Sequence, residues 1–102
     1  DVFVSIAGGL RLNEPAIDLA ILVSLLSSLR EIPFDSKTAL AGEVGLSGEV
    51  RPIGMAEQRI SEASKLGFKR IIIPEQNLKG MANERIEIVG VSSLEKAFDL
   101  LF

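Results

Sequence analysis

The sequence predicts an α/β (α+β) fold, in which mixed β-strands alternate with three main helices. Three observations support this fold class. Short runs rich in Val and Ile alternate with longer apolar or amphipathic segments, and glycines and prolines separate them. The length of 102 residues suits one domain with a single core. Because 47% of the residues are hydrophobic but only five are aromatic, all of them Phe, that core is expected to be aliphatic.

The first elements expected are a strand and a long helix. Residues 1–7 carry apolar side chains at most positions, as in a strand buried on both faces, and a pair of glycines ends them. A helix is predicted from an N-cap at Asn13 to about Arg30, with the carboxylate of Glu14 in its first turn. Since Asp18 is its only interior charge, this helix is expected to be central and buried nearly all round.

The middle of the chain is expected to form a hairpin and a second helix. Strands are predicted for residues 38–44 and 49–53, joined by a turn around residues 46–48. The helix is predicted over residues 55–66, and Gly67 stops it as the residue after the cap. Its inward-facing positions are Ala56, Ile60 and Ala63.

The last third is expected to contain two strands and a final helix. An apolar strand at residues 71–73 is ended by Pro74, and after a loop over residues 76–84 a further strand is predicted for residues 86–91. A capping box at residues 92–95 then begins the helix. Its inward-facing residues are Leu94, Ala97, Phe98 and Leu101.

The composition excludes several classes of site. With no Cys and no His, the chain has no thiol nucleophile, no imidazole base, no disulfide and none of the usual zinc ligands, so no metal site is expected. The net charge of −3 argues against a dedicated polyanion binder, although local basic clusters matter more than the total. No apolar run is long enough to cross a bilayer, and a cytoplasmic location without membrane contact is expected. The start at Asp1, without Met, suggests part of a longer chain.

Two stretches together resemble Lon-type proteases. Residues 42–54, with their spaced glycines and Pro52, look like the strand–turn–strand that precedes the catalytic lysine of that family. Residues 13–18, Asn-Glu-Pro-Ala-Ile-Asp, stand in the place of its nucleophile motif, Asp-Gly-Pro-Ser-Ala-Gly, and residues 68–74 continue the similarity. The resemblance implies a Lon proteolytic-domain-like fold for residues 1–102 as one domain. It also implies that Ala16, at the start of the long helix, lies near the turn at residues 54–59.

The departures from the Lon-type pattern decide the activity expected. That chemistry is a Ser–Lys dyad, in which a neutral lysine activates a hydroxyl. The nucleophile position is Ala16, which has no nucleophilic atom, and the lysine position is Arg59, whose guanidinium stays protonated. Asp18 puts a carboxylate where an oxyanion should be stabilised. These dyad positions are vestigial, so no enzyme activity is expected of this domain.

Residues 1–9, 14–20 and 42–52 resemble one family in that state, the C-terminal Lon-like domains of the bacterial DNA repair family RadA, also called Sms. The resemblance implies a parent chain with a zinc-binding module and a RecA-like, DNA-dependent ATPase that acts in recombination. Zinc, ATP and magnesium then belong to the parent, and this domain needs no cofactor. The resemblance further implies a ring-shaped homo-oligomer, expected to be a hexamer, with DNA and recombination proteins as partners.

The leading hypothesis is a non-catalytic platform for ring assembly and DNA contact. Arg51 and Arg59 flank the vacated dyad and suit phosphate contacts, and surface salt bridges to Glu49, Glu57 or Glu62 suit them equally well. The reserve DNA-binding candidates are Arg11, Arg30 and Lys65. The alternatives are a Lon-type peptidase that uses other residues and a pure oligomerisation module without DNA contact.

Overall fold

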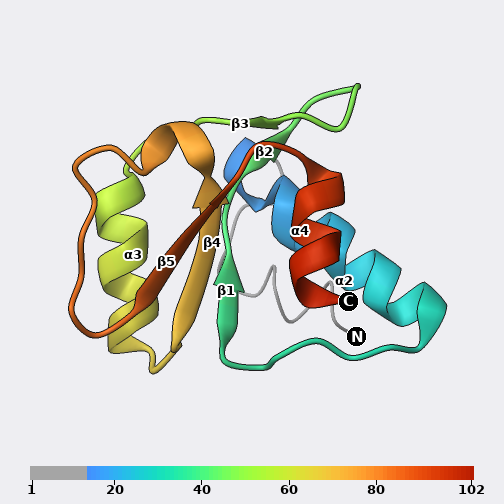
Figure 1. The fold of residues 1–102 in the computed structure, drawn as a ribbon, viewed down its shortest axis with the longest axis horizontal. Coiled ribbons are helices and arrows are strands. Elements are labelled where there is room, and N and C mark those ends of the chain that lie inside the picture. The colour runs from blue at the N-terminus through green and yellow to red at the C-terminus, as the bar shows by residue number, and fades with distance from the viewer. Residues whose placement is uncertain (1–13) are drawn as a thin grey trace.

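A three-stranded parallel sheet in the order β1-β4-β5 lies at the centre of residues 14–102, the part of the chain that this computed structural model describes (Figure 1). Its strands are β1 Thr38–Leu40, β4 Arg70–Pro74 and β5 Glu87–Val91. A separate antiparallel pair consists of β2 Glu43–Val44 and β3 Val50–Arg51. The helices are α2 Asp18–Arg30, α3 Ala56–Lys65 and α4 Leu94–Leu101, with 3-10 turns η1 Pro15–Ile17 and η2 Glu75–Asn77. The predicted fold class, mixed α/β with three main helices in this part of the chain, is confirmed.

The alternation of side chains along β4 divides the core into two layers. Ile72 lies on one face of the sheet with residues of α2 and α4, whereas Ile71 and Ile73 lie on the other face against α3. The first layer contains Leu19, Val23, Val50, Ile72, Val91 and Ala97. The second contains Ile60, Ala63, Ile71, Ile73 and Ile86. The core is aliphatic, as the composition predicts, and α3 is alone on its face of the sheet among the described helices (Figure 1).

The long helix ends at Arg30, as predicted, but it begins later and is less buried than expected. Its expected cap, Asn13, and the expected strand at residues 1–7 lie outside the described residues. The α-helix starts at Asp18 after η1, and its C-terminal end extends past β1 beyond the sheet (Figure 1). The side chain of Leu29 is therefore 79% exposed. The prediction of a helix buried nearly all round is wrong for its last turn, where Ser28, Leu29 and Arg30 are exposed.

The predicted strand at residues 38–44 is divided into β1 and β2. After β1, the N–H of Ala41 still donates to the carbonyl of Ile72 at 3.0 Å, but the N–H of Gly42 donates to the carbonyl of Ala16 at 2.8 Å. The chain thus leaves the sheet to bind η1. A Cβ at Gly42 would lie 3.0 Å from Cγ1 of Val50, so glycine permits this close approach.

The hairpin and the remaining helices follow the prediction with small shifts. Regular pairing of the second hairpin strand is limited to Val50–Arg51, and Gly48 in the turn has a φ of +83°. Helix α3 matches the predicted 55–66 range within a residue, and Gly67 follows it with a φ of +94°. The cap of α4 is Ser93 and not Ser92, because the hydroxyl of Ser93 accepts from the N–H of Lys96 at 3.1 Å. Within residues 14–102, no helix has both the length and the apolarity that a membrane span requires.

Candidate functional site

A cavity of about 200 Å³ lies between η1, the β2–β3 hairpin and the start of α3. It brings together the two positions that the Lon-type resemblance pairs, since Ala16 from η1 and Arg59 from α3 both line it. The other lining residues are Glu14, Pro15, Glu43, Pro52, Ile53 and Gly54. The prediction that Ala16 lies near the turn at residues 54–59 is confirmed. We call this space the dyad cavity.

Arg59 is held in the dyad cavity by two partners. Its Nη2 forms an ion pair with Oε1 of Glu14, and its Nε donates to the carbonyl of Gly54 at 3.0 Å. Both side chains of the pair are only 29% exposed. The carboxylate comes from a residue 45 positions away in the chain, so the short-range partners Glu57 and Glu62 considered from the sequence are wrong. A guanidinium held in this way is a structural cation and cannot act as a base.

The carboxylate of Asp18 also has a structural partner. Its Oδ2 accepts a hydrogen bond from the N–H of Val44 at 3.2 Å, which ties the start of α2 to β2. Glu14 and Asp18 therefore bind different groups, one a guanidinium and the other a backbone N–H. Nothing in this arrangement makes them a general acid–base pair.

Arg51, the other leading candidate for a phosphate contact, is paired within its own hairpin. Its Nη2 lies 2.8 Å and its Nε 3.1 Å from Oε2 of Glu49, and its Nη1 lies 4.0 Å from Oε2 of Glu43. Hydrogen bonds to the carboxylate lower the pKa of Glu49 below its usual value, first from its own backbone N–H and then from Arg51. A Cβ at Gly45 would lie 2.0 Å from this carboxylate. Glycine at this position therefore leaves the space that the side chain of Glu49 occupies.

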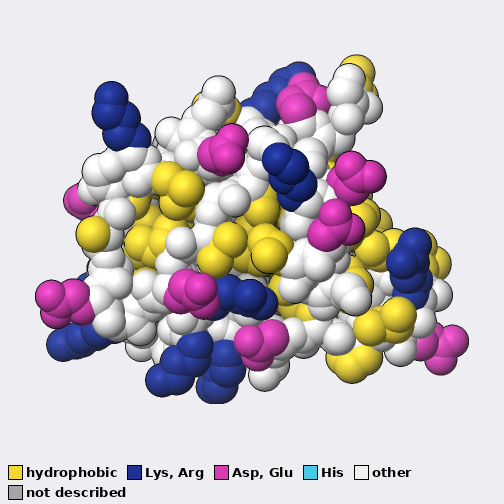
Figure 2. Space-filling model, in the orientation of Figure 1, with side chains coloured by type: hydrophobic (Ala, Val, Ile, Leu, Met, Phe, Trp, Pro, Cys, Tyr) yellow, Lys and Arg dark blue, Asp and Glu magenta, His cyan; other side chains and the backbone are white. Residues whose placement is uncertain are grey.

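The reserve candidates are not gathered around the dyad cavity. Arg30 is the exposed last residue of α2 and Lys65 the exposed last residue of α3, and these two helices lie on opposite sides of the described structure (Figure 1). Arg11 lies outside the described residues. Figure 2 shows Lys and Arg side chains interspersed with Asp and Glu on the face in view, without one large basic patch.

Asn77 is a residue of this site that the sequence pattern does not reveal. Its Oδ1 accepts from the N–H of Ile53 at 2.9 Å, and its Nδ2 donates to the carbonyl of Ile53 at 3.0 Å. The side chain thus pairs with Ile53 as a strand would, and fixes the wall of the dyad cavity. Next to this wall, Met55 adopts a left-handed φ of +59°, which is uncommon for a residue with a side chain. The sequence shows only an Asn in a loop. It does not reveal the hydrogen-bond partner, because Ile53 is 24 residues away in the chain.

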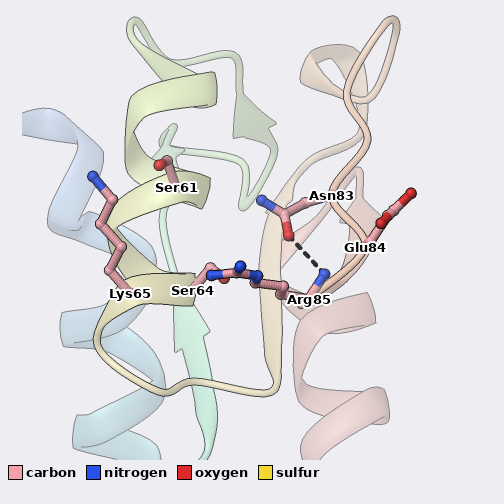
Figure 3. Close-up of a pocket in the computed structure, with 6 residues that line it drawn as sticks. All are labelled: Ser61, Ser64, Lys65, Asn83, Glu84 and Arg85. Atoms are coloured by element: carbon pink, nitrogen blue, oxygen red, sulfur yellow. Dashed lines mark hydrogen bonds between the residues drawn. The ribbon is translucent and has the colours of Figure 1, made fainter.

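A second cavity, of about 310 Å³, lies on the other side of α3. It is lined by Ser61, Ser64 and Lys65 from the helix and by Asn83, Glu84 and Arg85 from the loop before β5 (Figure 3). We call it the loop cavity. Neither cavity offers a metal centre, because residues 14–102 contain no group of three or more His, Cys, Asp or Glu side chains placed to hold a metal ion.

Comparisons with known proteins give one family model and a set of relatives that share one name. A family model described as subunit ChlI of Mg-chelatase matches residues 2–77. The chain is 50% identical over 98 residues to the DNA repair protein RadA of Bacillus subtilis strain 168, which covers 95% of this chain and 21% of that protein. It is 44% identical over 100 residues to RadA of Escherichia coli K12, covering 98% of this chain and 22% of that protein. The same name is carried by a Streptococcus pneumoniae relative, 40% identical over 103 residues, covering 100% of this chain and 24% of that protein. The chain thus spans between a fifth and a quarter of the length of these relatives.

Proposed function

The chain belongs to the family described as subunit ChlI of Mg-chelatase, and from this membership and its relatives named DNA repair protein RadA we propose that it is a non-catalytic Lon-like domain of a DNA repair ATPase. Its role is to assemble the parent into a ring and to contact DNA. The observation that carries the proposal is the content of the dyad cavity, where Ala16 faces an arginine already paired with Glu14.

The dyad cavity lacks each chemical requirement of a Ser–Lys peptidase. Ala16 offers no hydroxyl, and Arg59 keeps its proton and is bound by Glu14. Asp18, two residues after Ala16, is a carboxylate bound to the N–H of Val44 and offers no donor to an oxyanion. The double variant Ala16→Ser, Arg59→Lys is therefore expected to cleave no general peptide substrate and to take up no serine-reactive probe, because Glu14 would hold the new lysine protonated. Serine-dependent cleavage by this variant would contradict the proposal.

The proposal assigns the chemistry that this domain lacks to the rest of a longer parent chain. In the proposed parent, a RecA-like module uses ATP with magnesium, and a separate module binds zinc. The parent acts in the cytoplasm as a ring-shaped homo-oligomer, a hexamer, with recombination proteins as further partners. A ring repeats each DNA contact in every subunit, so contacts that are weak alone add up to useful affinity.

The test of DNA contact is a comparison of the full-length parent with a version that lacks this domain. Affinity for double-stranded DNA would be measured at two salt concentrations, with ring formation checked by light scattering. We expect the deletion to weaken binding and to reduce its dependence on salt, because fewer counterions are released. Equal affinity and equal salt dependence, with the ring intact, would remove DNA contact from the proposed function.

A pure assembly module is the second candidate, and a specific observation favours it. Both leading candidates for phosphate contact, Arg51 and Arg59, are engaged by carboxylates of the same chain. Changing both to Ala in the parent should then leave DNA affinity unchanged. If binding instead weakened equally for unrelated DNA sequences, these arginines would be phosphate contacts in spite of their ion pairs.

A further inference from the structure

The loop cavity brings together hydrogen-bond donors from two separate segments. Helix α3 contributes Ser61, Ser64 and Lys65, and the loop before β5 contributes Asn83, Glu84 and Arg85. In Figure 3 the guanidinium of Arg85 extends across the gap towards Ser64. The two segments are held against each other by the core layer of α3, which includes Ile60 and Ile86, so the spacing of the donors is fixed by buried residues.

The conformation of the loop directs further donors into the loop cavity. Oδ1 of Asn83 accepts from the N–H of Arg85 at 2.8 Å, which closes the turn and leaves the amide Nδ2 facing α3 (Figure 3). Glu84 points away from the helix in the same view. The carboxylate that would compete for the guanidinium is thereby turned outward.

The cations of this cavity lack ion pairs within residues 14–102. The salt bridges of that part of the chain involve Arg51 and Arg59, and neither Lys65 nor Arg85 takes part in one. The side-chain hydrogen bonds found there also give the guanidinium of Arg85 no acceptor. A planar guanidinium without a partner in the described residues, beside the hydroxyl of Ser64 and across from the amide of Asn83 (Figure 3), matches the geometry and charge of a tetrahedral oxyanion.

We propose that the loop cavity binds a phosphate group, with Arg85 as the bidentate donor and Ser64 and Asn83 as supporting donors. Resting on the proposed function, the phosphate belongs to the backbone of DNA. The contact is independent of base sequence, because phosphates carry none. This places the DNA contact of the domain at the loop cavity and not at the dyad cavity.

The first experiment measures binding of the full-length parent to two unrelated double-stranded oligonucleotides over a series of salt concentrations. Arg85→Ala is expected to weaken binding to both by about tenfold, as for the loss of a charged hydrogen bond. The slope of log affinity against log salt should fall by about one for each phosphate that the variant no longer binds. Arg85→Lys should restore part of the slope but little of the affinity, since it keeps the charge and loses the fork.

Lys79→Ala is the matched control, because Lys79 is an exposed cation of the same loop that does not line the cavity. It should leave affinity and slope unchanged. Equal losses for Lys79→Ala and Arg85→Ala would show a diffuse charge effect and overturn the site. No change with Arg85→Ala, in a parent whose DNA binding still depends on this domain, would overturn the site but leave the proposed function standing.

The second experiment separates DNA from a free phosphate as the ligand. The full-length parent and its Arg85→Ala variant would be titrated with inorganic phosphate by calorimetry and, in parallel, with DNA. Loss of both phosphate and DNA binding in the variant supports the proposal in full. Loss of phosphate binding alone supports the site but overturns DNA as the source of the phosphate, and retention of both overturns the site.

Discussion

The dyad cavity and the loop cavity lie along the same helix, yet they treat their cations in opposite ways. In the dyad cavity, Arg59 is neutralised by Glu14 and held by the carbonyl of Gly54. In the loop cavity, Arg85 and Lys65 have no ion pair within residues 14–102, and Glu84 is turned outward (Figure 3). Under the proposed assignment, the number of cations near a cavity does not by itself decide whether it binds an anion. What matters is whether the chain has already supplied the counter-charge.

Ile60→Ala is expected to have the largest effect, because it weakens the helix that both cavities share. Ile60 is 3% exposed and packs into the core layer behind α3. Its truncation should lower the free energy of unfolding by about 3 kcal/mol, from lost burial and the void that remains. Urea denaturation of the Ile60→Ala variant and of the unmodified chain would measure this loss in the free energy of unfolding. A loss below about 1 kcal/mol would mean that α3 is not held by this layer and that neither cavity is rigid.

Asn77→Ala separates the two cavities, because it acts on the dyad cavity alone. The change leaves both the N–H and the carbonyl of Ile53 without the partner they have now. We expect a loss of about 2 kcal/mol in the free energy of unfolding, the cost of two unpaired, half-buried backbone groups. Asn77→Asp is the comparison variant, since it keeps the acceptor for the N–H and replaces the donor with a carboxylate oxygen that faces the carbonyl of Ile53. If the Asn77→Ala variant were as stable as the unmodified chain, the wall at Ile53 would not depend on this side chain.

The Glu14–Arg59 pair can be measured by a double-mutant cycle with Glu14→Gln and Arg59→Gln. Because both side chains are 29% exposed, the pair is partly shielded from water. A coupling energy of about 1 kcal/mol is expected, smaller at high salt. The measurement is the unfolding free energy of the four variants. A coupling near zero would make the dyad cavity as open to an anion as the loop cavity.

The smallest effect expected is a pH dependence that arises in the hairpin. In the folded chain, hydrogen bonds to the Glu49 carboxylate lower its pKa. The largest effect comes from the backbone N–H of Glu49 and the next from the side chain of Arg51. A lowered folded-state pKa gives stability that is present above the unfolded value of the carboxyl and is lost as the pH falls through the folded value. Titration of the Glu49 carboxyl carbon by NMR should show a higher pKa in Arg51→Gln than in the parent chain. An unchanged pKa would mean that Arg51 is free to bind another anion.

Much of the fold could be predicted because it depends on local patterns. The apolar run of Ile71, Ile72 and Ile73 before Pro74 predicts a strand, and the spacing of Ala56, Ile60 and Ala63 predicts the inner face of α3. The errors occur where distant contacts decide. The burial of α2 depends on which distant segments pack against it, and no local pattern states this.

The candidate site was predicted in part. The nearness of Ala16 and Arg59 followed from the Lon-type resemblance, but the pairing of Arg59 with Glu14 and of Asn77 with Ile53 did not, since 45 and 24 residues separate these partners. The loop cavity was missed although Lys65 was a candidate. Arg85 joins it only because the core places the loop before β5 against α3.

The central claim is that phosphate binds at the loop cavity and not at the dyad cavity. Hydrogen–deuterium exchange of the full-length parent, with and without double-stranded DNA, tests it most directly. Peptides that cover residues 81–86 report on the loop cavity, and those that cover residues 52–55 report on the wall of the dyad cavity. We expect DNA to slow exchange in the first region and to leave the second unchanged. Slower exchange at residues 52–55, with none at residues 81–86, would contradict the account.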